Sequence, residues 1–210
     1  KPKDATPLLK QITELIDAVP LDFVRYRPQI LTLNSLAHFA LGEREKARPY
    51  LEALQTIQPA SPQVKLLAQI QMAESNLDRA IDTLERFTKA NPRDTQATAM
   101  LASALMARGH HARAASLMQE AVKLRDTPEL RTTLGLSLIG SRRVAGGVAE
   151  LEAAFKRDPN QTRAGAALVM LYLNSKQVPK AVSMAQSLVK IEPGNPSYQN
   201  LLGLALSQAG

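Results

Sequence analysis

Apolar residues recur along this chain with the spacing of helices that bury one face. Ala80, Leu84 and Phe87 stand at i, i+4 and i+7, which places them on one side of a helix. Sets of this kind begin with a small residue every 33 or 34 residues, and a proline follows four of these residues at a distance of twelve. The small residues are Ala47, Ala80, Ala114, Gly147 and Ala181, and the prolines are Pro59, Pro92, Pro159 and Pro193. This period predicts stacked helical hairpins, because one hairpin needs a neighbour to bury its apolar face.

The period divides the chain into five complete repeats with a partial element at each end. We expect helix pairs over 28–60, 61–94, 95–127, 128–161 and 162–195, and the first helix of a truncated sixth repeat over 196–210. Residues 1–27 are expected to form an N-terminal helix and a connection that cap or continue the array. The apolar stripe of that helix consists of Leu8, Leu9, Ile12, Leu15, Ile16 and Val19.

Local signals mark the expected helix ends. A capping residue precedes proline at Thr6-Pro7, Ser61-Pro62, Thr127-Pro128 and Asn195-Pro196, a pair that is typical of helix starts. Gly42 and Gly109 occupy one column between the two helices of a repeat, where a left-handed residue ends the first helix. Asn76, Gly140 and Asn174 are expected to end their helices in the same way.

The composition indicates a core of small and aliphatic side chains. Aromatic residues make up only 4% of the chain and tryptophan is absent, so Leu, Ala, Val, Ile and Met must supply the burial. The absence of cysteine excludes disulfides, thiolate metal sites and a cysteine nucleophile. No run approaches the roughly 20 apolar residues of a transmembrane helix.

The net charge of +7 is distributed unevenly. Residues 95–210 carry 13 basic and 7 acidic side chains and contribute most of the excess. A candidate basic patch consists of Arg142, Arg143, Lys156, Arg157 and Arg163, and it predicts contact with an anionic polymer as an alternative function. A second explanation covers part of it, because Lys156 belongs to a column of lysines in the last turn of each second helix, where cations complement the helix dipole.

Repeat by repeat, the columns resemble the tetratricopeptide repeat over residues 28–210. The best runs are Leu134–Pro159, LGLSLIGSRRVAGGVAELEAAFKRDP, and Leu168–Pro193. The resemblance implies an all-α, right-handed superhelical α-α solenoid that binds a protein or peptide in a concave groove lined by the first helices. Asp126 replaces the third closing proline, and the tryptophan that is frequent early in the first helix is replaced in all five repeats, by Leu31, Val64, Thr98, Arg131 and Gly165.

At a finer level, the stretch from Leu130 to Gly210 is similar to the tetratricopeptide lipoproteins of bacterial exosortase and exopolysaccharide systems. It contains LRTTLGLSL and YQNLLGLALSQAG. This resemblance implies a scaffold in a bacterial assembly for exopolysaccharide or protein export. It favours a periplasmic location or attachment through a lipid anchor outside this sequence, with the cytoplasm as the alternative, and it makes an anionic polysaccharide a second candidate partner.

The first helices carry an apolar ladder that packing within one repeat does not require. Its residues lie five positions beyond the core-facing leucine, about 140° around the helix. The ladder consists of Phe39, Met72, Met106, Ile139 and Leu173. The remaining candidate groove residues precede it by three or seven positions and are Leu36, Lys65, Gln69, Ser103, Thr132, Leu136 and Met170. Two interpretations stay open: an exposed strip that binds an apolar peptide or partner helix, or a seam buried between successive first helices.

Catalytic chemistry finds no support in the sequence. The three histidines have no companion ligands or acid–base partners nearby, so we expect His38 to be a half-buried packing residue and His110 and His111 to be solvated in a turn. The chain lacks HExxH, GxSxG and a glycine-rich phosphate loop. We therefore predict a non-enzymatic protein without a cofactor or metal. Nucleic acid is not an expected partner, because the groove is mostly apolar and lacks stacking aromatics.

Overall fold

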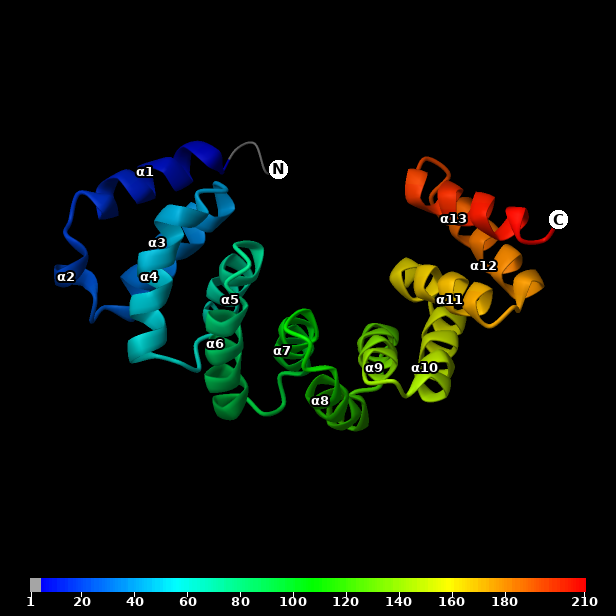
Figure 1. Ribbon diagram of the computed structural model, residues 1–210. Coiled ribbons are helices and arrows are strands. Elements are labelled where there is room, and N and C mark those ends of the chain that lie inside the picture. Colours follow the sequence, from blue (N-terminus) through cyan, green and yellow to red (C-terminus); the bar gives the residue numbers. More distant parts are fainter. Residues whose placement is uncertain (1–4) are drawn as a thin grey trace. The chain divides into compact units, whose positions relative to one another are not determined.

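A computed structural model describes residues 5–210, which form thirteen α-helices and no strand (Figure 1). The helices are α1 Thr6–Asp17, α2 Leu21–Val24, α3 Pro28–Ala40, α4 Arg44–Ile57, α5 Val64–Ala73, α6 Leu77–Ala90, α7 Thr95–Ala107, α8 His111–Leu124, α9 Pro128–Gly140, α10 Val144–Arg157, α11 Thr162–Asn174, α12 Val178–Ile191 and α13 Pro196–Ser207. The prediction of an all-helical chain is confirmed. Residues 1–4 of the expected N-terminal element lie outside the described part.

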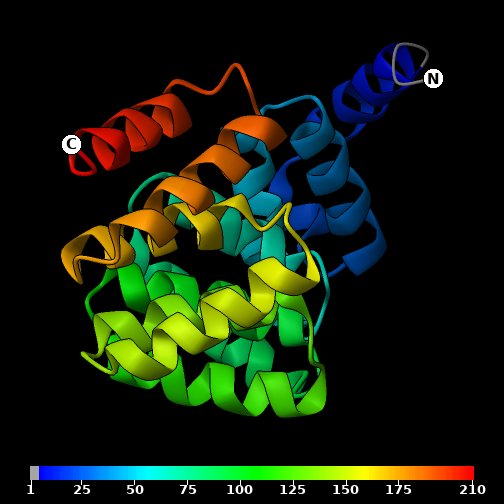
Figure 2. The same ribbon diagram turned by 90° about the vertical axis from the view of Figure 1, so that its right-hand side faces the viewer.

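The chain divides into two compact units, with the boundary between Ala104 and Leu105. In the first unit α3 packs against α4 and α5 against α6, while α4 also contacts α5 and α1 lies against α3. In the second unit α9 pairs with α10 and α11 with α12, and α13 lies beside α12 (Figure 2). The first helices α9, α11 and α13 also contact one another in sequence. Each unit therefore stacks helices in the order in which they follow along the chain.

The column of small residues lies where paired helices cross. Ala47, Ala80, Ala114 and Ala181 are completely buried. At Gly147 a Cβ atom would stand 2.8 Å from the carbonyl oxygen of Gly135, and at Gly135 it would stand 2.9 Å from the carbonyl oxygen of Gly147. Helices α9 and α10 therefore approach so closely that neither crossing position has room for a side chain.

The turns inside the repeats contain one left-handed residue each. The prediction is confirmed at Gly42 and Gly109, which have φ of +79° and +85°. It is wrong for Asn76, Gly140 and Asn174, because the left-handed residues of the other turns are Ser75, Arg142 and Lys176, with φ of 61°, 65° and 57°. These three stand in the column of the two glycines, at intervals of 33 or 34 residues. The backbone of the turn therefore imposes this conformation whatever the side chain.

Gly140 is the last residue of α9 and has a different role. A Cβ atom there would lie 2.3 Å from Nδ1 of His111, so the glycine makes room for the imidazole ring. His111 is half-buried, which corrects the expectation that it is solvated in a turn.

Two of the four predicted helix starts are confirmed. The hydroxyl of Thr127 accepts a hydrogen bond from the backbone nitrogen of Leu130 at 3.4 Å, and the side chain of Asn195 accepts one from Ser197 at 3.0 Å. The other two are wrong. Thr6 lies inside α1, after Ala5 at the cap position, and α5 begins only at Val64. Residues 61–63 instead form a tighter turn, in which the backbone nitrogen of Val64 donates to the carbonyl oxygen of Ser61.

The departures Arg131 and Asp126 compensate for each other. Arg131 donates to both carboxylate oxygens of Asp126, at 2.6 and 2.9 Å, and to Glu150 at 2.6 Å. Arg157 donates to the same aspartate at 2.7 Å. The hydrogen bond from Arg131 is the main cause that lowers the pKa of Asp126 to about 2. A charged cluster therefore occupies the junction where the repeat pattern usually places an aromatic ring and a proline.

Candidate functional site

The apolar ladder lies mainly between helices. Phe39 packs against the buried cluster of Ala47, Leu51, Leu67 and Ile70. In the second unit the hydroxyl of Ser137 lies 3.0 Å from the sulfur of Met106, and a Cβ atom on Gly147 would stand 2.5 Å from Cγ1 of Ile139. Met72 is half-buried like these three, and Leu173 is buried. The ladder therefore contributes more to packing than to the surface.

The groove residues three positions before the ladder are more accessible than the ladder itself. Leu36, Gln69 and Met170 are exposed, whereas Ser103 and Leu136 are half-buried. This row thus presents exposed apolar side chains on α3 in the first unit and on α11 in the second.

The polar groove candidates are already engaged within the protein. Lys65 Nζ lies 2.8 Å from Asp94 Oδ2 and 3.2 Å from the side-chain oxygen of Gln96. Burial raises the pKa of Asp94, but the bonds from Lys65 and from backbone amides outweigh it, so this pKa stays below its usual value. Thr132 is buried, and its hydroxyl donates to the carbonyl oxygen of Pro128 at 2.8 Å. A partner would therefore find few free charges here.

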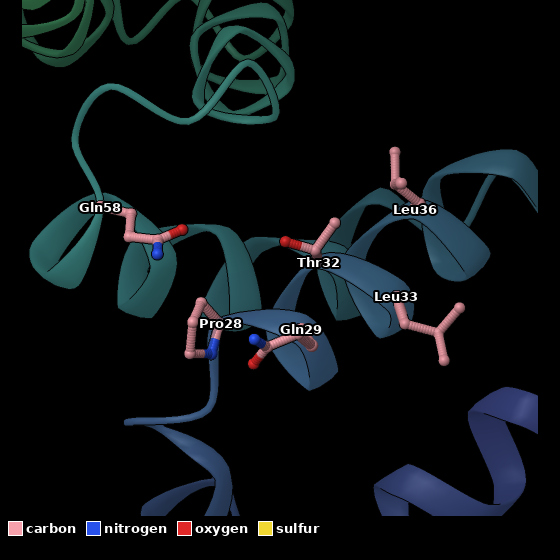
Figure 3. A pocket seen from close by; sticks show the side chains of 6 residues that line it. All are labelled: Pro28, Gln29, Thr32, Leu33, Leu36 and Gln58. Carbon is pink, nitrogen blue, oxygen red and sulfur yellow. The ribbon is translucent and has the colours of Figure 1, made fainter.

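A cavity opens on α3 in the first unit. Its volume is about 390 Å³, within the range of small ligand pockets. It is lined by Pro28, Gln29, Thr32, Leu33, Leu36 and Gln58. Leu33 is 48% exposed and Leu36 is 40% exposed, and Thr32 and Leu36 extend from the same side of the helix (Figure 3). Leu36 is among the predicted groove residues, whereas Leu33 is not, because Leu33 lies outside the columns that define the ladder.

A second cavity, of about 540 Å³, lies between α10 and the α11–α12 hairpin. Val148 and Leu171 contribute to its apolar lining, and Tyr172 and Lys180 stand among the polar groups. The hydroxyl of Tyr172 donates to Glu152 at 2.6 Å, and burial together with this carboxylate raises the tyrosine pKa. No pattern in the sequence indicated this cavity, because its residues come from three helices.

The candidate basic patch divides into separate groups. Arg142 and Arg143 lie in the turn before α10, while Lys156 and Arg157 are at its other end, which is about 20 Å away for a helix of 14 residues. Arg163 lies in the first turn of α11. Arg157 is also bound to Asp126. The five cations therefore do not form one continuous surface.

His38 is completely buried, at 0% exposure, which corrects the expectation of a half-buried residue. Its Nδ1 lies 2.7 Å from Oε2 of Glu43, and its Nε2 lies 3.0 Å from Oδ1 of Asp17. Across residues 5–210 no group of three or more potential ligands is arranged to hold a metal ion. In the same range no helix is long and apolar enough to cross a bilayer.

Solved structures share this fold at low sequence identity. MamA from Desulfovibrio magneticus RS-1 matches with a TM-score of 0.71 and 15% identity, covering 80% of this chain and 97% of that one. A thermophilic TPR protein from Thermus thermophilus, TTC0263, matches with a TM-score of 0.68 and 19% identity, covering 86% of this chain and 99% of that one. YrrB, described as a TPR protein with an unusual peptide-binding site, matches with a TM-score of 0.67 and 16% identity, covering 86% of this chain and 94% of that one.

Sequence comparison identifies the family. A search of curated proteins gave no match. Two family models, both described as tetratricopeptide repeat, match residues 65–128 and 138–205, which together make up more than half of the chain. With the paired helices and their constant period, these matches show that the chain belongs to the tetratricopeptide repeat family.

Proposed function

We propose that this chain is a non-enzymatic scaffold that binds an apolar segment of a partner protein on the exposed face of its first helices. The cavity on α3 is the observation that carries this proposal. It offers Leu33 and Leu36 as an apolar wall on a helix whose other faces are packed. The family supports the same function, since tetratricopeptide repeat proteins are protein-interaction scaffolds.

The lining of the cavity indicates the chemistry of the bound segment. Leu33 and Leu36 would contact an apolar side chain. Gln29, Gln58 and Thr32 offer amide and hydroxyl groups, which both donate and accept hydrogen bonds and would pair with the backbone of an extended peptide. Among residues 5–210 the lining includes no charged side chain, so binding should depend little on salt.

The wider setting of the scaffold rests on the sequence alone. The similarity of Leu130–Gly210 to exopolysaccharide-associated lipoproteins supports a role in bacterial export, in the periplasm or at a lipid anchor. An anionic polysaccharide is the alternative partner. It has less support, because Arg157 is paired with Asp126 and the remaining cations are divided among the two ends of α10 and the first turn of α11.

A peptide-display selection tests the proposal. Peptides selected at high salt on the intact chain would be titrated against Leu36→Lys and against Leu124→Lys, a matched control that changes a 62% exposed leucine at the end of α8. We expect Leu36→Lys to weaken binding by about tenfold or more, the scale of a lost apolar anchor, and the control to leave it unchanged. Equal binding by both variants would contradict the proposal. An anionic polymer that binds the chain at low salt in a separate titration, and no longer binds after Arg142→Ala with Arg143→Ala, would support the alternative.

A further inference from the structure

We propose that α1 is a detachable cap on the first helical hairpin, held in place by a charged His38 that bridges Asp17 and Glu43 and released when that charge is lost. The bridge joins three elements of the first unit. Asp17 is the last residue of α1, His38 lies within α3, and Glu43 is the residue before α4.

The geometry of the bridge specifies the protonation state of His38. An ionised carboxylate only accepts hydrogen bonds, and a neutral imidazole carries a single N–H. Both ring nitrogens lie within hydrogen-bond distance of a carboxylate oxygen, at 2.7 Å for Glu43 and 3.0 Å for Asp17. Both contacts are therefore hydrogen bonds only when the ring carries two protons and a positive charge.

The two carboxylates remain ionised over a wide range. The hydrogen bond with His38 is the main cause that holds the pKa of Glu43 below its usual value, and Lys46, at 3.5 Å, adds to it. Burial raises the pKa of Asp17, but hydrogen bonds from Asn34, His38 and Tyr50 outweigh this effect and lower it overall. Because the pKa values of both carboxyl groups are lowered, the ionised carboxylates stabilise the attachment at and above the usual carboxyl pKa. This stabilisation is lost only as the pH falls below that value.

The attachment of α1 depends heavily on Asp17. Oδ1 of Asp17 also accepts hydrogen bonds from Asn34 and from the Tyr50 hydroxyl, both at 2.9 Å. By contrast, Thr13 is the single buried residue of α1, and Leu15 is 74% exposed. Since no apolar residue of the helix is fully buried, losing the bridge removes much of what holds it.

Release follows from the loss of one proton. When His38 becomes neutral, its single N–H can serve only one of the two carboxylates, and the other ring nitrogen presents a lone pair to the second carboxylate, so that contact becomes repulsive. Docking of α1 is therefore strong while His38 carries its charge and weakens once the ring is neutral. Detachment also withdraws Ile16 from the cluster of Val24, Leu31, Tyr50 and Leu54, which uncovers an apolar face.

Amide hydrogen exchange and histidine NMR test this cap. The chain contains three histidines, so the imidazole proton signal of His38 can be followed against those of His110 and His111. We expect protection factors in α1 to fall by about tenfold or more as the His38 signal titrates, while those in α10 stay constant. Protection in α1 that does not change across the His38 titration would overturn the proposal, and so would a His38 signal that shows a neutral ring while α1 is docked.

A variant separates the charge from the shape of the side chain. His38→Gln keeps hydrogen-bonding capacity without a positive charge, and it should give low α1 protection at every pH. High protection in this variant would contradict the mechanism. If the substitution unfolds the first hairpin, exchange in α4 reports it, and the pH series on the unsubstituted chain still decides the question.

Discussion

The close approach of α9 and α10 makes a sharp prediction about two adjacent glycines. In Gly147→Ala the new methyl would lie 2.5 Å from Cγ1 of Ile139 and 2.8 Å from the carbonyl oxygen of Gly135. The Gly135 oxygen belongs to the backbone, so the helices themselves must separate. Overpacking of this kind costs about 1–3 kcal/mol, while replacing glycine by alanine inside a helix returns about 1 kcal/mol. We expect a net loss of about 0–2 kcal/mol.

Gly146→Ala is the matched control. Its methyl would meet only Cδ1 of Leu138, at an ordinary 3.8 Å, so the gain in helix propensity of about 1 kcal/mol should appear undiminished. The gain in helix propensity is the same in both variants. The difference between their free energies of unfolding, about 1–3 kcal/mol, therefore measures the overpacking alone. Urea unfolding followed by circular dichroism gives both values. If Gly147→Ala is as stable as Gly146→Ala, the close crossing deduced for α9 and α10 is wrong.

Three further predictions concern turns and titrating groups. Arg142→Gly should stabilise the chain by roughly 1 kcal/mol in thermal melts, because it relieves a left-handed φ of 65°, whereas Gly109→Ala should destabilise it by a similar amount. The pKa of Asp126 is lowered to about 2, so its pairing with arginine stabilises the folded chain above the usual carboxyl pKa. This stabilisation is lost as the pH falls from about 4 to 2. The difference in Tm between the unsubstituted chain and Asp126→Asn should therefore vanish over this interval. The pKa of Tyr50 is raised to about 12, mainly by burial, so it favours the folded state until the pH rises from about 10 to 12, and the difference between ultraviolet titrations of the unsubstituted chain and Tyr50→Phe should show this residue ionising above its usual value of about 10. A Tyr50 difference signal that titrates at the usual tyrosine value would refute that assignment.

The sequence predicts the helices well because their cause is local and repeated. The column of Ala47, Ala80 and its equivalents follows from a crossing that needs a small residue in every repeat. The left-handed turn residues Ser75, Arg142 and Lys176 were missed because the hydrogen bonds of the turn determine the conformation, and the side chains carry no preference for it. Only the period of the two glycines Gly42 and Gly109 could have pointed to them.

The candidate site was harder to predict for a different reason. Helical spacing places Phe39 and Leu36 on neighbouring stripes, but their exposure depends on how the next helix packs, which one helix does not reveal. The bridge at His38 depends on Asp17, which lies 21 residues earlier along the chain and meets it only when α1 docks. The finer resemblance to exopolysaccharide-associated lipoproteins gains no support from the comparisons, which establish the family and the fold.

The most direct test of the scaffold function is to map where a selected peptide binds. Backbone amide signals recorded while the peptide is titrated should shift most in α3, around Thr32, Leu33 and Leu36, and this pattern should persist at high salt. Shifts that centre on Arg142 and Arg143, or that disappear when salt is added, would contradict an apolar binding face on the first helices.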